Sequence, residues 1–172
     1  MTPSDPGAEL VDVLDEAGRP VGRATRREMR ARRLPHRCVY ILVFNQRGEP
    51  FVHLRTPTKD VYPSHWDVAV GGVLAAGETF DAGARRELEE ELGVETPLTP
   101  LFPFRYEDAA TVVHAMVYSA VHEGPFRLQP EEIVEGRFVD WPAFNALAAR
   151  APVCPDSLAV VAEYRRHETP GR

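Results

Sequence analysis

Three glutamates near the middle of the chain have the spacing of a metal-binding helix face. Glu87, Glu90 and Glu91 lie in the segment 79–92, whose apolar residues recur at the interval of an amphipathic helix. At about 100° per residue, the three carboxylates fall within an arc of about 100°. Like charges at this spacing destabilise a helix by about 0.2–0.5 kcal/mol per pair. A hard divalent cation such as Mg²⁺ or Mn²⁺ would offset that repulsion, because carboxylate oxygens are its preferred ligands.

A solvent-exposed acidic surface is the alternative explanation for this run of glutamates. Two features of the sequence argue against it. The carboxylates border the apolar stripe of Ala84, Leu88 and Leu92 instead of opposing it. A predicted strand that ends in the glycine pair Gly71-Gly72 also precedes the helix. Both features favour a site at the edge of the core.

The same segment resembles the signature of the Nudix hydrolase family, Gly-x5-Glu-x7-Arg-Glu-U-x-Glu-Glu-x-Gly-U, in which U is aliphatic. All nine specified positions agree: Gly72, Glu78, Arg86, Glu87, Leu88, Glu90, Glu91, Gly93 and Val94. With residue frequencies of about 5–10% at each position, a chance match in one window is on the order of 10⁻⁸ or rarer. The resemblance implies an α/β/α sandwich with a mixed β-sheet. It also implies hydrolysis of a nucleoside diphosphate linked to another group.

The resemblance further implies a role for each acidic residue. Glu90 and Glu91 would be metal ligands, and Glu87 would be a ligand or the group that orients or deprotonates water. The carbonyl of Gly71 often joins the metal shell in this family, and Arg86 would pair with carboxylates and hold the loop to the helix. Mg²⁺ is the expected cofactor, with Mn²⁺ as a substitute, because it neutralises pyrophosphate oxygens while water attacks phosphorus.

The resemblance also implies a further catalytic glutamate, which members of the family often carry on a loop that follows the sheet and precedes a short strand and a tryptophan. The segment 130–141, which ends at Trp141, fits that context. Glu132 is the first candidate for the general base and Glu135 the second, while Glu87 could fill the role instead.

Residues outside the signature are candidates for substrate contacts. Arg55 and Lys59, near the end of a predicted strand, are candidates for binding phosphates, against the alternative of solvated loop charges. Phe104 and Tyr106 are candidates for stacking on a base, although core packing is the stronger alternative for both.

Four segments outside the signature resemble the Nudix branch that contains isopentenyl-diphosphate isomerases and their hydrolase-like relatives. They are Leu10-Val11-Asp12-Val13 with Gly18, Arg26-Arg27-Glu28, Leu34-Pro35-His36-Arg37 and Pro155-Asp156-Ser157-Leu158. The isomerases use a cysteine and a metal-binding histidine near the start of the signature, where this chain has Gly71 and Val73. Isomerase activity is therefore not expected. A non-catalytic nucleotide-sensing domain is another alternative, but such domains usually degrade the acidic signature that this chain retains.

The substrate class is reached by elimination. ADP-ribose hydrolases tend to carry a proline, and diadenosine-polyphosphate hydrolases a tyrosine, about 16 residues beyond the signature, where this chain has Ala109-Ala110-Thr111-Val112. The signature of coenzyme A hydrolases is absent too. A nucleoside di- or triphosphate remains the leading substrate, with a sugar nucleotide or an isoprenoid diphosphate as alternatives. The base and the bond that is cleaved stay open.

The elements that must position these residues are short, because 16 prolines interrupt the chain. We expect strands at 10–13, 20–25, 38–44, 50–54, 66–70, 98–105, 111–121 and 136–139, and helices at 26–34, 79–92, 142–150 and 157–167. Strands outnumber helices without a regular βαβ rhythm, which favours an α+β or α/β/α sandwich with a mixed sheet.

Length and composition bound the remaining possibilities. We expect the 172 residues to form one domain, with residues 1–8 as a loose tail. With 20 basic and 26 acidic residues the net charge is −6, which argues against a nucleic-acid partner. No apolar stretch is long enough to span a membrane, and no secretory signal is recognisable. We therefore expect a cytoplasmic protein, monomeric or homodimeric, that binds a small nucleotide.

Overall fold

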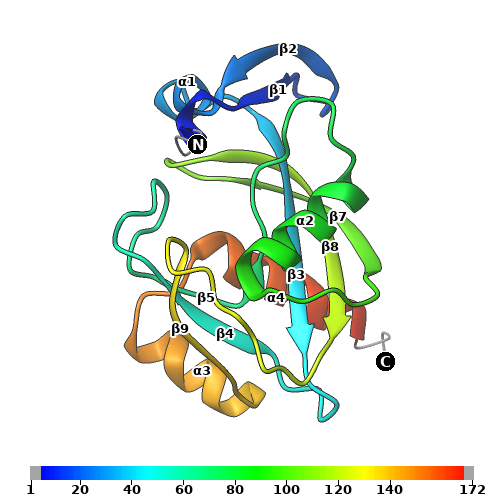
Figure 1. Ribbon diagram of the computed structural model, residues 1–172, viewed down its shortest axis with the longest axis vertical. Coiled ribbons are helices and arrows are strands. Elements are labelled where there is room, and N and C mark those ends of the chain that lie inside the picture. The colour runs from blue at the N-terminus through cyan, green and yellow to red at the C-terminus, as the bar shows by residue number, and fades with distance from the viewer. Residues whose placement is uncertain (1–4, 169–172) are drawn as a thin grey trace.

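The computed structural model describes residues 5–168, over which strands and helices alternate irregularly (Figure 1). The elements are, in chain order, η1 (Pro6–Ala8), β1 (Leu10–Leu14), β2 (Pro20–Thr25), α1 (Arg26–Ala31), β3 (His36–Phe44), β4 (Phe51–Arg55), β5 (Trp66–Asp67), β6 (Ala69–Val70), α2 (Phe80–Leu92), β7 (Thr99–Glu107), β8 (Val112–Val121), β9 (Ile133–Phe138), α3 (Trp141–Arg150) and α4 (Pro155–Glu168). Most of these elements begin or end within a few residues of the predicted positions.

The strands of residues 5–168 form three sheets. A hairpin joins β1 to β2, a central sheet has the order β6-β3-β8-β7, and a third sheet has the order β5-β4-β9. Strands β3 and β8 run parallel along their whole length, from His36 opposite Val113 to Phe44 opposite Val121. The other strand pairs are antiparallel. The predicted mixed sheet is thus confirmed.

Strand β3 is buried on both faces, which explains its uninterrupted apolar sequence. Successive side chains of a strand point to opposite faces. Tyr40 and Leu42 belong to the core that includes residues of α3 and α4. Val39 and Ile41 belong to the core that includes the apolar stripe of α2. Figure 1 shows α2 in front of the central sheet and α4 behind it, so the molecule has the predicted α/β/α layering.

Helix α2 has well-defined ends that fix the position of its glutamates. Thr79 caps the first turn, its hydroxyl accepting a hydrogen bond from the amide of Ala82 at 3.2 Å. Gly93 ends the helix in the left-handed conformation, with φ of 66°. The predicted helix over 79–92 therefore corresponds to α2 with its cap.

The β1–β2 hairpin is fastened to the loop that leads into α2. Asp12 is buried and accepts hydrogen bonds from the Arg37 guanidinium at 2.7 Å and from the amide of Gly77 at 2.8 Å. A backbone hydrogen bond of 2.8 Å from the amide of Ala76 to the carbonyl of Leu10 adds to this connection. The hairpin therefore supports the acidic helix although it lies outside the central sheet.

Two expectations differ from the structure. The strand expected over 66–70 is split at Val68, because β5 pairs with β4 whereas β6 pairs with β3 in another sheet. The loose tail expected over residues 1–8 is ordered from Asp5 onward, where Asp5 pairs with Arg27 at 2.5 Å and η1 follows. Residues 1–4 lie outside the described range.

Among residues 5–168, no helix combines the length and apolar character needed to cross a lipid bilayer.

Candidate active site

The acidic face of α2 lies half inside the core. Glu87 and Glu91 are 8% and 6% exposed, whereas Glu90 is solvent-exposed. Glu91 accepts a hydrogen bond from the amide of Gly71 at 3.3 Å. The Glu91 carboxylate therefore faces the backbone of the glycine pair.

Both glycines allow a close approach that a side chain would block. A Cβ atom on Gly71, whose φ is +150°, would lie 2.0 Å from the carbonyl oxygen of Val39. A Cβ atom on Gly72 would lie 2.7 Å from Oε1 of Glu87. The glycine pair thus lets the backbone run against β3 on one side and against the buried carboxylate on the other.

Arg86 connects the acidic helix to the loop before it. Its guanidinium donates two hydrogen bonds to Glu78, at 2.8 and 2.9 Å. It also donates to Glu87 at 2.8 Å and to Glu90 at 3.2 Å. The amide of Ala75 donates to Glu78 at 2.9 Å. One guanidinium therefore orients two carboxylates of α2 and anchors them to the loop.

Burial disfavours the ionised forms of the two inner glutamates. Desolvation raises the pKa of Glu87 to about 7, although Arg86 opposes the shift. Burial and the neighbouring Glu87 raise the pKa of Glu91 well above its usual range. A nearby positive charge would therefore favour the ionised forms of both groups.

The donor set fits a hard divalent cation, since it offers only oxygen atoms. Over residues 5–168 no three carboxylate, imidazole or thiol groups already converge as a complete metal cage. One oxygen each of Glu87 and Glu90 instead accepts from Arg86.

These carboxylates open onto a cavity of about 520 Å³, here called the carboxylate cavity. Besides the glycine pair and the glutamates of α2, its walls include Arg26, Lys59, Gln129 and Glu132. Lys59 and Glu132 form an ion pair. Glu135, the second candidate for the general base, instead lies exposed on β9, 3.8 Å from Arg137. Of the two glutamates predicted as general base in the segment 130–141, Glu132 is thus the one on the wall of this cavity.

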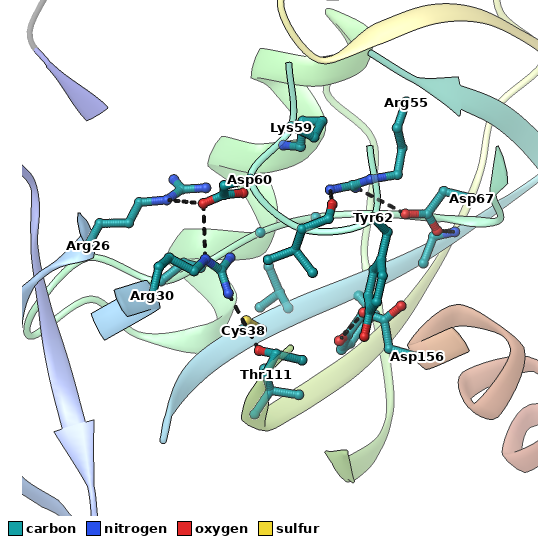
Figure 2. A pocket seen from close by; sticks show the side chains of 18 residues that line it. Arg26, Arg30, Cys38, Arg55, Lys59, Asp60, Tyr62, Asp67, Thr111 and Asp156 are labelled. Atoms are coloured by element: carbon teal, nitrogen blue, oxygen red, sulfur yellow. Dashed lines mark hydrogen bonds and ion pairs between the residues drawn. The ribbon is translucent and has the colours of Figure 1, made fainter. Parts of the chain in front are cut away.

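A second cavity of about 70 Å³ adjoins the first, and we call it the tyrosine cavity (Figure 2). Tyr40, Tyr62 and Asp156 line it. Both cavities share four wall residues: Arg26, Lys59, Gly71 and Gly72. A ligand bound beside the α2 carboxylates can therefore reach from one cavity into the other.

The predicted phosphate-binding residues both line the tyrosine cavity, but each already has a partner. Arg55 donates to Asp67 at 3.2 Å and to the carbonyl of Val61 at 2.9 Å. Lys59 is paired with Glu132 and also reaches the carboxylate cavity. Lys59 therefore lies where both cavities meet, whereas the Arg55 charge is held by a buried aspartate.

The predicted base-stacking residues lie on β7, outside the walls of both cavities. Phe104 contacts Tyr40 edge to face, with ring centroids 5.9 Å apart. Tyr106 stacks on Phe104 and donates a hydrogen bond to Asp108 at 3.2 Å. Their role in stacking on a base stays a prediction.

Several residues of the cavity walls are not among those that the sequence indicated. Arg26 and Arg30 extend from α1 to Asp60, at 4.0 and 3.0 Å, as Figure 2 shows. Their separation of four residues on a basic helix was the available signal. Asp156 lies in a segment that resembles one Nudix branch, but no spacing linked it or Tyr62 to the cavity, because only the fold brings their distant segments together.

Comparisons with known proteins match most of the chain to one family. The model of the family described as NUDIX domain matches residues 34–163. An uncharacterized Nudix hydrolase of Pseudomonas aeruginosa is 43% identical over 158 residues, which cover 91% of this chain and 94% of the relative. The uncharacterized Nudix hydrolase YfcD of Escherichia coli is 39% identical over 156 residues, covering 90% and 85% of the two chains.

Solved structures show the same fold. The crystal structure of DR0079 from Deinococcus radiodurans matches with a TM-score of 0.80 and 28% identity, covering 90% of this chain and 98% of that one. The NUDIX domain of Shewanella oneidensis NrtR, solved in complex with ADP ribose, matches with a TM-score of 0.60 and 18% identity over 77% and 88% of the chains. The chain therefore belongs to the Nudix hydrolase family, enzymes that act on nucleoside diphosphate derivatives and generally use divalent metal ions.

Proposed function

We propose that the protein is a divalent-metal-dependent pyrophosphohydrolase that cleaves a phosphoanhydride bond of a nucleoside di- or triphosphate by attack of water on phosphorus. The observation that carries the proposal is the composition of the carboxylate cavity. Oxygen ligands for a cation, on α2, face the same space as Arg26 and Lys59, which suit phosphate oxygens. A metal-bound diphosphate needs both kinds of group.

Glu87, Glu90, Glu91 and the carbonyl of Gly71 would hold the metal. Mg²⁺ is the proposed ion, with Mn²⁺ as a substitute, because the ligands are hard oxygen atoms. When bound, the ion supplies Lewis-acid chemistry that withdraws charge from the phosphoanhydride. The role of Arg86 is then to keep two of these carboxylates beside the glycine pair.

Glu132 is the proposed general base. Its carboxylate lies on the wall of the carboxylate cavity and is ion-paired with Lys59. When a substrate phosphate engages Lys59, the glutamate loses part of this interaction and can accept a proton from the attacking water. Glu87 stays an alternative base, whereas Glu135 lies outside the walls of this cavity.

A turnover panel tests the proposal. Nucleoside di- and triphosphates of each base, ADP-ribose, sugar nucleotides and isopentenyl diphosphate are incubated with Mg²⁺ or Mn²⁺, and released phosphate and pyrophosphate are measured. We expect metal-dependent release from the nucleotides. Glu90→Gln should reduce kcat by about 10²–10³, as does removal of a group that stabilises transition-state charge. Glu89→Gln is the matched control, since Glu89 is an exposed neighbour on α2 that lines neither cavity.

The outcomes separate the alternatives. Release only from a sugar nucleotide or isopentenyl diphosphate would keep the chemistry but replace the substrate class. Tight nucleotide binding without turnover would identify a sensing domain. Equal turnover by Glu90→Gln and the unmodified protein would contradict the proposed metal site.

A further inference from the structure

We propose that Asp156, in the wall of the tyrosine cavity, recognises the exocyclic amino group of the substrate base, so that nucleotides of cytosine, adenine or guanine are preferred to those of uracil or thymine. The inference rests on the proposed nucleotide hydrolysis and deepens it by naming the class of base. Asp156 lies in the first turn of α4, more than 60 residues beyond the acidic signature.

The position of Asp156 suits a base-binding residue. The two cavities meet at Lys59 and at the glycine pair. With the phosphates beside the carboxylates of α2, the rest of a nucleotide can extend past Gly71 toward the tyrosine cavity. Figure 2 shows Tyr62 and Asp156 together at one end of this cavity, away from Arg26. The base would thus reach Asp156 while the phosphates remain near the metal ligands.

Asp156 has spare hydrogen-bonding capacity, and that capacity is for donors. The Tyr40 hydroxyl donates to its Oδ2 at 2.8 Å, and the amide of Ser157 donates to its Oδ1 at 2.9 Å. Each oxygen of an ionised carboxylate can accept two hydrogen bonds. One acceptor position therefore remains on each oxygen, and the hydroxyl and the amide that occupy the others are neutral.

Most charged donors that line the same cavity are engaged elsewhere. Arg55 donates through Nη1 to Asp67 and through Nη2 to the carbonyl of Val61, and its Nε is buried without a partner among residues 5–168. The Tyr62 hydroxyl donates to Asp108, and Arg30 donates to Asp60. An incoming base therefore meets free acceptor positions at Asp156. A carboxylate in this setting suits an amino group.

Cytosine and uracil illustrate the resulting discrimination, because their rings have the same shape. Cytosine presents an amino group where uracil presents a carbonyl oxygen, and aspartate accepts hydrogen bonds from the cytosine amino group. A carbonyl placed against the Asp156 carboxylate would bring two acceptors together and leave both unpaired. Sites that bind a specific polar group discriminate strongly against analogues that lack it. The ring of Tyr62, on the cavity wall, offers a surface on which either base could stack.

The test compares substrate pairs that differ at this group. The ratio of kcat/KM is measured for CDP over UDP and for ADP over IDP, whose hypoxanthine has a carbonyl in place of the adenine amino group. For the unmodified protein we expect each ratio to be about tenfold or more, the effect of one hydrogen bond to a charged group. In Asp156→Asn the ratios should fall to about threefold or less, because the amide can also donate to a carbonyl.

A matched variant controls for general damage to the cavity. Asp60 lines the same cavity, but its carboxylate is paired with Arg26 and Arg30. Asp60→Asn should therefore keep the base preference of the unmodified protein even where its overall rate falls. Equal use of CDP and UDP by the unmodified protein would overturn the inference, as would an unchanged preference in folded Asp156→Asn.

Binding measurements separate this inference from the proposed function. Calorimetric titration with CMP and UMP reports base recognition without turnover. If no nucleotide is hydrolysed but CMP binds about tenfold more tightly than UMP, and only Asp156→Asn removes the difference, the proposed function fails and the inference stands. If nucleotides are hydrolysed equally well with and without the amino group, the proposed function stands and the inference fails.

Discussion

Arg86 offsets part of the negative charge of the acidic helix and of the loop before it with a single guanidinium. It contacts Glu78, Glu87 and Glu90, and Glu87 is buried. Removing one partner of a buried ion pair leaves the other charge uncompensated. The metal-free protein therefore depends on this residue for the order of its own candidate metal ligands.

We expect Arg86→Gln to lower the free energy of unfolding of the metal-free protein by about 2–4 kcal/mol, measured by urea denaturation in the presence of a chelator. Arg85→Gln is the matched control, because Arg85 is the exposed neighbour of Arg86 on the same helix. The control should change stability by no more than about 0.5 kcal/mol. A similar loss in both variants would show that Arg86 contributes only as a helix residue.

Asp156 gives a second prediction at the same scale, concerning pH. Burial, together with the charge of Asp67, raises the pKa of Asp156 from 3.8 to about 6. Because the pKa is higher in the folded state, the group stabilises the fold fully below about pH 4, and this contribution is lost as the pH rises through 6. We expect Asp156→Asn to match the unmodified protein at pH 4 and to exceed its free energy of unfolding by about 1–3 kcal/mol at pH 8.

The pKa of Asp60 is shifted in the opposite direction, so its effect on stability depends on pH in the opposite way. Burial opposes ionisation of Asp60, but Arg30 and Arg26 outweigh it and lower the pKa of that carboxyl. The contribution of Asp60 is therefore present above its unfolded pKa and lost as the pH falls through the folded value. Asp60→Asn should be destabilising at pH 8, where Asp156→Asn is stabilising. Urea denaturation at both pH values checks the pair, and a shared direction at pH 8 would refute the assignment of these environments.

The residues found by sequence reasoning and those missed differ in how local their signal is. Glu87, Glu90 and Glu91 are close in sequence, so one helix face brings them together whatever the rest of the chain does. Tyr62 and Asp156 meet only in the fold, where the loop after β4 and the start of α4 line one cavity and Tyr40 of β3 donates to Asp156. No periodicity links such positions. The metal-ligand candidates could therefore be predicted, and the tyrosine cavity could not.

At the scale of elements, a strand could be predicted from the sequence where all residues of the segment pair within one sheet. Alternation along 111–121 and the apolar run at 38–44 each correspond to a strand of the central sheet. The segment 66–70 failed because its two halves pair with different sheets. The side chain of Asp67 accepts a hydrogen bond from the amide of Ala69 at 3.0 Å, which supports the bend between them. The β-propensity of its residues indicates that a segment forms a strand, but it does not indicate with which strand that segment pairs.

The β1–β2 hairpin yields a prediction at this scale, since Asp12 fastens it to the loop before α2. We expect Asp12→Ala to lower the free energy of unfolding by about 2–4 kcal/mol, because it leaves the half-buried Arg37 without its carboxylate partner and the amide of Gly77 without its acceptor. Hydrogen exchange at Gly77 should become faster as well. Glu16→Ala, an exposed change in the turn of the same hairpin, is the control and should be neutral. Unchanged exchange at Gly77 would mean that the hairpin does not support the loop.

For the molecule as a whole, charge is segregated in a way that the net value of −6 conceals. Arg26, Arg30 and Lys59 gather on α1 and the loop after β4, opposite the carboxylates of α2. An anionic substrate and a divalent cation would each find the charge they require within one continuous space. The carboxylates of the acidic helix would interact more strongly with a bound cation than with water. Folding and metal binding should therefore be linked.

We expect Mn²⁺ at about one hundred times its dissociation constant to stabilise the folded protein by about 2.7 kcal/mol, because only the folded chain brings the carboxylates together. For a chain of this size, the midpoint of thermal unfolding should rise by about 5–10 °C. The double variant Glu90→Gln/Glu91→Gln should lose this shift, whereas Glu89→Gln should keep it. Thermal denaturation with and without Mn²⁺ needs no substrate, so it tests the metal site even where turnover fails. An equal shift in the double variant would place the ion elsewhere on the molecule, and the carboxylates of α2 would then need another explanation for their burial.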